Sequence, residues 1–228
     1  EHKPKVIFCE NVKGLVIHDK GRTFKIITKT FEDLGYKVFY KVLNSKDYGV
    51  PQNRERIYIV AFRNDIHSDN FTFPEPTDTN KVLADIIEEQ EVSVKYYLST
   101  VYLDTLRKHK ARHAAKGNGF GYEIRDLQGI AGAIVCGGMG RERNLIIDNR
   151  LTNFVPVTKI KGEVNREGIR KMTPREWARL QGFPDNYKLA LADVHLYKQF
   201  GNSVTVPVIT AIAKQIKLIL DQNATIIQ

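Results

Sequence analysis

The sequence predicts an α/β fold, because strand-like and helix-like patterns alternate in its N-terminal part. Residues 4–9 (PKVIFC) form a short apolar run without helical period, which is typical of a buried parallel strand. Residues 21–34 carry apolar side chains at three- and four-residue spacing, which predicts an amphipathic helix ended by Gly35. Residues 36–43 alternate and residues 57–62 are continuously apolar, so both are predicted strands. Functional groups of such a fold are expected where strands end.

The middle of the chain changes in character. The proline-rich polar stretch 73–80 (FPEPTDTN) indicates a domain boundary, and residues 99–116 have the pattern of a basic helix. Residues 131–144 (AGAIVCGGMGRERN) join a small-residue strand to a glycine-rich loop that carries arginines. This segment therefore combines a flexible backbone with positive charge.

The C-terminal part begins with a strong helix start. Thr173 and Glu176 form a T-x-x-E capping box with Pro174 at the first helical position. Residues 206–220 are apolar at helical spacing and predict a last helix.

Composition narrows the class of protein. The 228 residues are 42% hydrophobic and 27% charged, which is typical of a globular chain with a sizeable core. No apolar run reaches the ~18 residues of a membrane span, so we expect no membrane association. Cys9 and Cys136 lie far apart and form neither a disulfide framework nor a zinc pattern, so we expect no metal and a reducing cytoplasm. Because the chain starts with Glu1 instead of Met, we expect a fragment of a longer protein.

Positive charge is concentrated in the middle and at the end of the chain. The net charge is +9; residues 93–150 hold ten Lys and Arg against five Asp and Glu, and residues 151–228 hold eleven against six. Residues 1–78 are nearly balanced, at thirteen against eleven. The basic segments are therefore expected to face a polyanion, although a merely basic solvated surface remains an alternative.

Four stretches occur in a specific order: FCENVKGL (8–15), YGVPQNRERIYIVAF (48–62), MTPREWARLQGFPDNY (172–187) and KQFGNSVTVPV (198–208). In this order they resemble the C-terminal half of the bacterial DNA (cytosine-5)-methyltransferases. The resemblance implies the second half of a Rossmann-like, S-adenosylmethionine-dependent methyltransferase sheet plus a small target-recognition domain. The implied divisions are residues 1–78 of the catalytic domain, residues 79–172 for DNA reading, and residues 173–228 returning to the catalytic domain.

The resemblance assigns the chemistry to Glu10, Arg54 and Arg56. The glutamate of Glu-Asn-Val hydrogen-bonds or protonates N3 of cytosine while a nucleophile adds at C6, and Glu10 matches it. The arginines of Gln-x-Arg-x-Arg reach the flipped cytosine and the phosphates beside it, with Arg56 at the base and Arg54 as support. Gln52 of the same motif is expected at the nucleic acid. The plainer alternatives are a solvated Glu10 and an arginine in a surface ion pair with Glu55.

The family's last motif, Gly-Asn-Ser-Val, closes the pocket for S-adenosylmethionine. Asn202, Ser203 and Val204 are therefore the expected cofactor-binding residues, although the motif alone reads as a helix N-terminus.

The variable segment between the motifs is expected to read double-stranded DNA. Gly137, Gly138, Arg141 and Arg143 occupy its glycine-rich loop, and arginine is the commonest bidentate reader of guanine. Five basic residues of the predicted helix are expected along phosphates, although a solvated face is an equal alternative for each: Arg107, Lys108, Lys110, Arg112 and Lys116. Residues 117–147 look most like those of enzymes that modify CCGG.

Two motifs of the family are expected in a missing N-terminal half, namely the glycine-rich Phe-x-Gly-x-Gly loop and the Pro-Cys nucleophile. Cys9 does not replace that cysteine, because neighbours on a strand point to opposite faces and Glu10 adjoins it. The favoured interpretation is half of a methyltransferase with an exposed apolar edge at its first strand. The alternatives are a catalytically inactive DNA-binding module and an RNA-binding or structural α/β protein.

Overall fold

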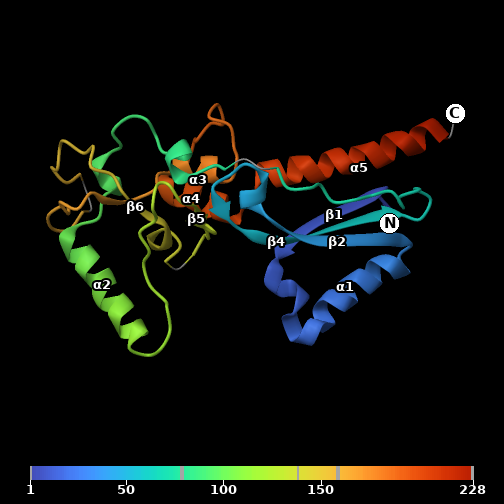
Figure 1. The fold of residues 1–228 in the computed structure, drawn as a ribbon, viewed down its shortest axis with the longest axis horizontal. Coiled ribbons are helices and arrows are strands. Elements are labelled where there is room, and N and C mark those ends of the chain that lie inside the picture. Colours follow the sequence, from blue (N-terminus) through green and yellow to red (C-terminus); the bar gives the residue numbers. More distant parts are fainter. Residues whose placement is uncertain (1, 78–79, 138, 158–159, 227–228) are drawn as a thin grey trace. The chain divides into compact units, whose positions relative to one another are not determined.

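The computed structural model describes residues 2–77, 80–137, 139–157 and 160–226, which form two compact units (Figure 1). The first unit comprises Glu1–Tyr48, Arg54–Thr79 and Val204–Gln228; the second comprises Gly49–Asn53 and Asn80–Ser203. The sequence places a boundary near residue 78, and the first unit's middle segment ends there. The chain was expected to return to the catalytic domain at residue 173, but it re-enters the first unit only at Val204. The helices between these positions contribute to the core of the second unit.

The first unit contains a three-stranded sheet of order β1-β4-β2, formed by β1 (Val6–Val12), β4 (Glu55–Arg63) and β2 (Tyr36–Asn44). The three predicted strands are confirmed, but the expectation of a parallel pairing for the first is wrong. Both β1 and β2 pair antiparallel with β4, which returns between them. Because β1 is an edge strand of this sheet, its residues Val6 to Glu10 are only half-buried.

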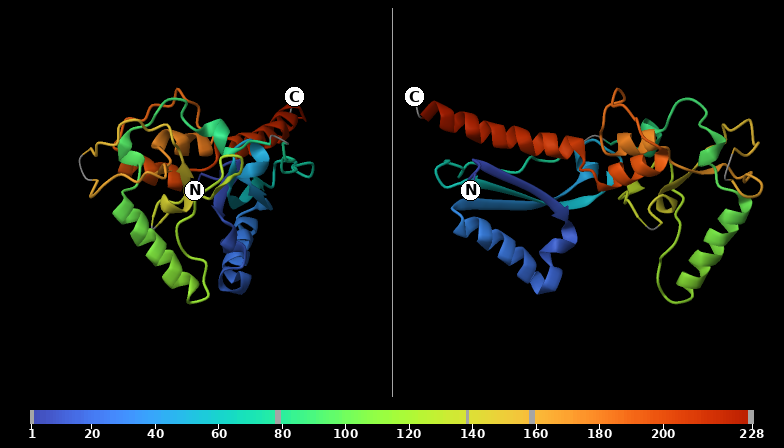
Figure 2. Two further views of the ribbon diagram at one scale, coloured as in Figure 1. Left: turned by 60° about the vertical axis from the view of Figure 1, so that its left-hand side comes forward. Right: turned by 180° about the vertical axis from the view of Figure 1, so that it is seen from behind.

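Helices cover both faces of this sheet (Figures 1 and 2). On one face α1 (Arg22–Asp33) packs Phe24 and Ile27 against Ile57 and Ile59 of β4. On the other face α5 (Val206–Ile226) packs three buried aliphatic side chains against the aromatic side of the sheet: Val208, Ile212 and Ile219. Because successive side chains of β4 point to opposite faces of the sheet, the strand contributes to two separate apolar clusters.

One helical stretch of the described residues, Asp193–Thr225, is long and apolar enough to cross a membrane by length and composition. An 18-residue window within it has a mean hydropathy of 1.5. It runs through two helices, and Val208 and Ile212 are fully buried in the core of the first unit. Of the 18-residue window that meets the criterion, 22% is buried in the structure.

The second unit holds α2 (Thr100–Ala114), α3 (Pro174–Leu180) and α4 (Asp193–Asn202) with two small sheets. The strands are β3 (Gln52–Asn53) parallel to β5 (Ala131–Gly132), and β6 (Leu145–Ile147) antiparallel to β7 (Ile169–Lys171). Short 3-10 helices complete the described chain: Lys13–Val16, His18–Gly21, Ser45–Tyr48, Leu83–Ile86, Val94–Tyr96 and Glu142–Asn144.

The predicted capping box is present at the start of α3. The Thr173 side chain accepts from the Glu176 amide, and Glu176 accepts from the Thr173 amide at 2.7 Å. The helix carries the chain's single tryptophan, Trp177, which is 1% exposed and packs against Tyr197 of α4.

Candidate functional site

Glu10 and Arg56 meet on one face of the first unit's sheet. Glu10 lies opposite Tyr58 across β1 and β4, and Val12 lies opposite Arg56, so strand alternation directs all four side chains to the same face. The Nε atom of Arg56 is 3.1 Å from Oε1 of Glu10, and the two side chains are 13% and 21% exposed. Two expected catalytic residues therefore form a shielded ion pair that still reaches the surface.

The opposite face of β1 carries Cys9. This thiol packs in the cluster of Ile57, Ile59 and α1, and burial raises its pKa. The sequence-based exclusion of Cys9 as a partner of Glu10 on one base is consistent with this geometry.

Arg54 is a buried guanidinium beside this pair, only 3% exposed. Burial, and then the charge of Arg56, lower the pKa of Arg54 to about 10, against the opposing effects of Glu10 and Tyr58. Burial, and then Glu10, raise the pKa of Tyr58 well above its usual range. The cluster therefore combines two guanidinium groups with the Glu10 carboxyl group and a neutral Tyr58 phenol, and its two guanidinium groups suit an anionic or carbonyl ligand.

The backbone around Arg54 is fixed by neighbours in the first unit. Its amide donates to Oδ1 of Asn44 at 3.0 Å, and its carbonyl accepts from the Ser45 amide at 3.0 Å. The Ser45 hydroxyl lies 2.8 Å from that of Thr205, which precedes α5. The end of β2 and the start of α5 thus hold the arginine segment in place.

Gln52 does not lie where the sequence prediction placed it. Its side chain is 0% exposed and belongs to the second unit, where Nε2 donates to the Leu180 carbonyl at 2.8 Å and Oε1 accepts from the Ile134 amide at 3.0 Å. Because both ends of the amide are engaged inside the protein, its expected contact with DNA is corrected to a role in holding these segments together.

The Gly-Asn-Ser-Val segment connects two helices: it ends α4 and lies directly ahead of α5, as the sequence suggested. Gly201 and Asn202 end α4, and Ser203 and Val204 link it to α5. The Asn202 side chain is exposed, whereas Ser203 is half-buried and its hydroxyl donates to the Phe200 carbonyl at 2.9 Å. Asn202 is therefore the residue of this motif with an amide accessible to a ligand.

The two arginines of the glycine-rich loop differ in exposure, because Arg143 is exposed whereas Arg141 is half-buried. Arg143 is exposed, with its guanidinium carbon 5.4 Å from the ring centre of Phe120, and Arg141 lies equally far from the ring centre of Tyr197. The intervening Glu142 is buried and binds the Tyr102 hydroxyl and the Lys171 ammonium, at 3.2 and 3.3 Å. A buried carboxylate thus anchors a loop whose neighbouring cations remain accessible.

Glycines let this loop fold back on itself. A Cβ atom on Gly140 would lie 2.3 Å from the Val135 carbonyl oxygen, whereas one on exposed Gly137 would meet nothing within 4 Å. Gly137 and Arg141 line a cavity of about 250 Å³ together with Trp177 and Tyr197. Gly138, also expected in the interface, lies outside the described residues.

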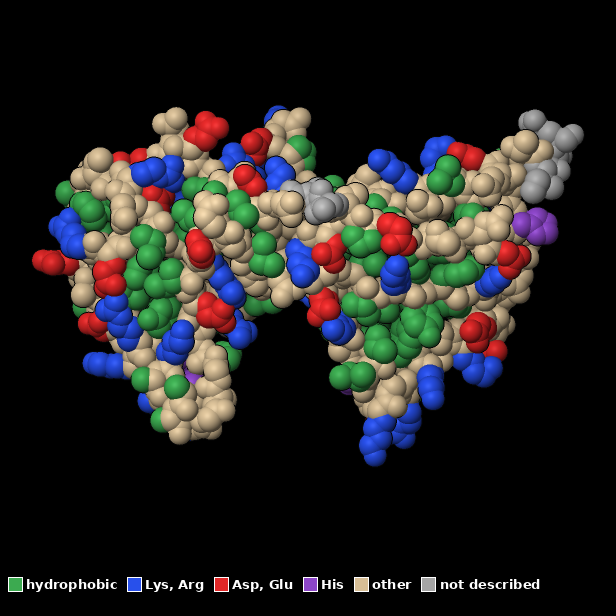
Figure 3. Space-filling view, viewed as in Figure 1, with side chains coloured by type: hydrophobic (Ala, Val, Ile, Leu, Met, Phe, Trp, Pro, Cys, Tyr) green, Lys and Arg blue, Asp and Glu red, His purple; other side chains and the backbone are tan. Residues whose placement is uncertain are grey.

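The basic helix is confirmed as α2, and Figure 3 shows Lys and Arg side chains around it. Arg107 differs from the other cations expected along phosphates, because it pairs with Glu167 at 2.7 Å and with Asp104 at 3.3 Å. Lys108, Arg112 and Lys116 are exposed and are the better candidates for phosphate contacts.

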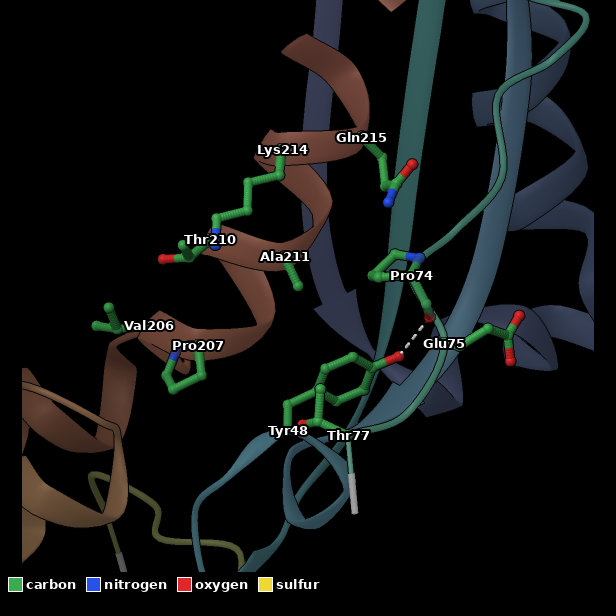
Figure 4. A pocket seen from close by; sticks show the side chains of 10 residues that line it. All are labelled: Tyr48, Pro74, Glu75, Thr77, Val206, Pro207, Thr210, Ala211, Lys214 and Gln215. Atoms are coloured by element: carbon green, nitrogen blue, oxygen red, sulfur yellow. Dashed lines mark hydrogen bonds between the residues drawn. The ribbon is translucent and has the colours of Figure 1, made fainter. Parts of the chain in front are cut away.

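A further cavity of about 500 Å³ lies in the first unit, between the first turns of α5 and residues 74–77 (Figure 4). Tyr48 donates from its hydroxyl to the Pro74 carbonyl at its edge, and Lys214 and Gln215 line it from the helix. The residues predicted for the site do not line this cavity. Among the described residues there is also no group of three or more His, Cys, Asp or Glu placed to hold a metal ion.

Sequence reasoning missed Tyr58, Glu142 and also Gln181, whose Oε1 atom lies 3.3 Å from Nε2 of Gln52. Tyr58 follows Arg56 by two residues, so strand alternation could have identified it as a neighbour of Glu10. Gln181 and Glu142 are defined by contacts between distant segments, which no local pattern shows.

Comparison with known proteins gives a consistent result. A family model described as C-5 cytosine-specific DNA methylase matches residues 1–218. The type II methyltransferase M.HpaII of Haemophilus parainfluenzae is 64% identical over 217 residues, covering 94% of this chain and 61% of the relative. M.SsoII of Shigella sonnei is 42% identical over 224 residues, covering 97% and 55%. The chain thus spans less than two thirds of the length of these relatives.

Solved structures show the same fold. An Entamoeba histolytica methyltransferase has a TM-score of 0.68 at 21% identity, and the match covers 96% of this chain and 63% of that structure's chain. The S. pombe Dnmt2 methyltransferase has a TM-score of 0.67 at 18% identity, and the match covers 96% of this chain and 68% of that structure's chain. The α/β fold of this chain therefore corresponds to part of a methyltransferase fold.

Proposed function

Since this chain belongs to the family of C-5 cytosine-specific DNA methylases, we propose that it supplies the catalytic glutamate, the arginines and the DNA-reading surface of such an enzyme. The reaction is methyl transfer from S-adenosylmethionine to C5 of a cytosine flipped out of a short specific duplex site. An N-terminal part supplies the cysteine nucleophile and the first cofactor motif. The proposal places the enzyme in a type II restriction-modification system of the bacterial cytoplasm.

The Glu10–Arg56 pair carries this proposal. Glu10 is directed to N3 of the flipped cytosine, where a hydrogen bond or proton stabilises the charge that develops as the nucleophile adds at C6. Arg56, 3.1 Å away, orients the carboxyl group and offers its remaining donors to the base carbonyl. Arg54 supports both from its buried position by keeping a second positive charge beside them.

The cofactor motif fits this role through Asn202. Its exposed amide can donate to and accept from the amino-acid part of S-adenosylmethionine, with Ser203 and Val204 beside it. When bound, S-adenosylmethionine supplies the electrophilic methyl group.

The edge strand supports the proposal of a half-sheet. Among the described strands β1 pairs with β4 alone, so its other edge presents unpaired backbone groups beside half-buried Val6 and Phe8. The N-terminal part of the enzyme is proposed to continue the sheet at this edge and to complete the Rossmann-like domain.

DNA reading is proposed for the loop with Gly137, Arg141 and Arg143 and for the exposed cations of α2. Residues 117–147, which resemble those of enzymes that modify CCGG, favour CCGG as the target. A catalytically inactive DNA-binding module is the second candidate, favoured by the concentration of basic residues in 93–150.

Labelled methyl transfer to a duplex containing CCGG tests the proposal. The chain is assayed alone and then with a family N-terminal half that carries the Pro-Cys and glycine-rich motifs. We expect activity only in the mixture, reduced about 10²- to 10⁴-fold by Glu10→Gln. Glu32→Gln, at an exposed position of α1, is the matched control and should leave the rate unchanged.

Two outcomes would contradict it. Activity of the chain alone would show that the nucleophile lies within these residues. DNA binding without activity in the mixture would favour the inactive binding module.

A further inference from the structure

Two buried glutamines join three of the sequence motifs inside the second unit. Gln52 and Gln181 are both 0% exposed, and Nε2 of Gln52 lies 3.3 Å from Oε1 of Gln181. Gln52 belongs to the Gln-x-Arg-x-Arg motif, and Gln181 follows the last residue of α3. A fully buried amide pair of this kind is costly to disturb, because each lost partner leaves a polar group without water.

On one side the pair holds the strand that leads into the glycine-rich loop. The Oε1 atom of Gln52 accepts from the Ile134 amide at 3.0 Å, and β3 pairs with β5 from Gln52 to Ala131. The loop residues Gly137 and Arg141 follow within seven positions of Ile134. A displacement of this loop would therefore be transmitted to Gln52 through its hydrogen bond with the Ile134 amide.

On the other side the pair holds the end of α4. Nε2 of Gln181 donates to the Phe200 carbonyl at 2.9 Å and to the Ser203 carbonyl at 3.2 Å. These two residues flank Gly201 and Asn202, so the amide of Gln181 fixes the backbone from which Asn202 projects.

A direct contact runs beside this route. A Cβ atom on Gly201 would lie 2.5 Å from the Cys136 amide nitrogen and 2.8 Å from its Cα. The glycine of Gly-Asn-Ser-Val therefore lies against the backbone of the glycine-rich loop. The loop and the cofactor motif are thus connected twice, once through the amides and once by backbone contact.

We propose that the Gln52–Gln181 pair is a positioning device that couples the two ligands, so that the specific DNA site and S-adenosylmethionine bind with positive cooperativity. The inference rests on the proposed function and goes beyond it, because neither the reaction nor the DNA reading requires such coupling. A loop settled on its target fixes Ile134, and Gln52 and Gln181 transmit that position to the backbone of Asn202. Linkage then requires that S-adenosylmethionine strengthen binding of the specific site by the same factor.

A purely structural pair would behave differently. Gln52 and Gln181 would then satisfy buried backbone groups and contribute to folding stability, and a substitution would lower stability without changing the ratio of ligand affinities. The coupling ratio, defined as cofactor affinity with the duplex over affinity without it, therefore separates the two interpretations.

The experiment uses the chain assembled with its N-terminal half, and S-adenosylhomocysteine as the probe so that no turnover occurs. Calorimetry measures the affinity of the assembly for this probe under three conditions. These are without DNA, with a duplex containing CCGG, and with a duplex of equal length that lacks the site. We expect the specific duplex to raise the affinity about 5- to 150-fold, the usual range of such coupling. Gln181→Met, which keeps the length of the side chain and removes both donated bonds, should reduce this ratio at least threefold. Gln222→Met, the same change at an exposed position of α5, is the control and should leave the ratio as in the wild type.

Each outcome bears on one statement. An unchanged ratio in Gln181→Met, or a ratio of one in the wild-type assembly that binds both ligands, overturns the coupling and leaves the proposed function intact. A wild-type assembly that does not bind the probe at all refutes the proposed function instead. Emission of the buried Trp177 reports whether a variant is folded. If Gln181→Met is not, Gln52→Met, which keeps the length of the side chain, adds no buried charge and removes the bonds to Leu180 and Ile134, takes its place with the same criteria.

Discussion

Replacement of Glu176 by alanine should strongly destabilise the second unit. The Glu176 carboxylate is 0% exposed and accepts from two nitrogens of Arg170, each at 2.8 Å. It also accepts from the Thr173 amide at 2.7 Å, as part of the cap of α3, and from the Glu88 amide at 3.2 Å. Arg170, equally buried, keeps one other carboxylate, that of Asp148 at 2.8 Å.

The size of the effect follows from these contacts. Removing one partner of a buried ion pair costs about 3–5 kcal/mol of unfolding free energy, because the other charge is left uncompensated. Since Asp148 remains beside Arg170, we expect about 3 kcal/mol from the pair, and the Thr173 amide that loses its acceptor adds about 1 kcal/mol, while the amide of residue 176 still donates to the Thr173 hydroxyl. Glu176→Gln retains an acceptor for the Thr173 amide, so its loss should be smaller, about 2 kcal/mol.

Urea unfolding followed by tryptophan fluorescence measures this loss. Trp177 is the chain's single tryptophan, adjoins Glu176 and is 1% exposed, so its emission reports the second unit directly. Glu167→Ala is the matched control, because it breaks a pair with Arg107 of similar distance, 2.7 Å, whose side chains are 52% and 43% exposed. The control should leave the free energy of unfolding nearly unchanged, because solvent screens this exposed pair.

A loss below about 1 kcal/mol for Glu176→Ala, with an unchanged dependence on urea, would refute the reasoning. It would mean that Asp148 alone compensates Arg170 and that the hydrogen bond from the Thr173 amide to the Glu176 carboxylate is dispensable.

Two further predictions concern pH and DNA. Burial alone would raise the pKa of Asp148, but hydrogen bonds from Arg150 and Arg170 outweigh it and hold that pKa well below its usual range. The contribution of Asp148 to stability is therefore present above about pH 4 and is lost as the pH falls below that value. Asp148→Asn should flatten the dependence of the unfolding free energy on pH below about pH 4 in acid titrations, and an unchanged slope would argue against this assignment. In the DNA-binding assembly, Arg143→Ala should weaken binding of the CCGG duplex by about 1–3 kcal/mol in fluorescence anisotropy. Arg107→Ala, whose guanidinium is already paired with a carboxylate, should change it far less; equal losses would contradict the placement of Arg143 at the DNA.

Local patterns in the sequence were sufficient for the three strands of the first unit's sheet, for α1, α2, α5 and the start of α3, and for the family. Helical spacing predicted α1 within one residue at each end, and the Thr173–Glu176 box predicted the start of α3. The ordered motifs also identified Glu10 and Arg56, which the structure brings within 3.1 Å. These features depend on side chains a few residues apart, or on motifs with a characteristic order, and both can be read along the chain.

Only the tertiary structure decided how these elements pair and which polar groups are buried. An apolar run does not specify the direction of its neighbour, so the antiparallel return of β4 between β1 and β2 could not be read from residues 4–9. Gln52 seemed suited to DNA because it precedes two arginines, yet its partners Ile134 and Gln181 lie 82 and 129 positions away. Burial and hydrogen bonding are properties of such distant contacts, because a side chain loses water only when remote segments close over it.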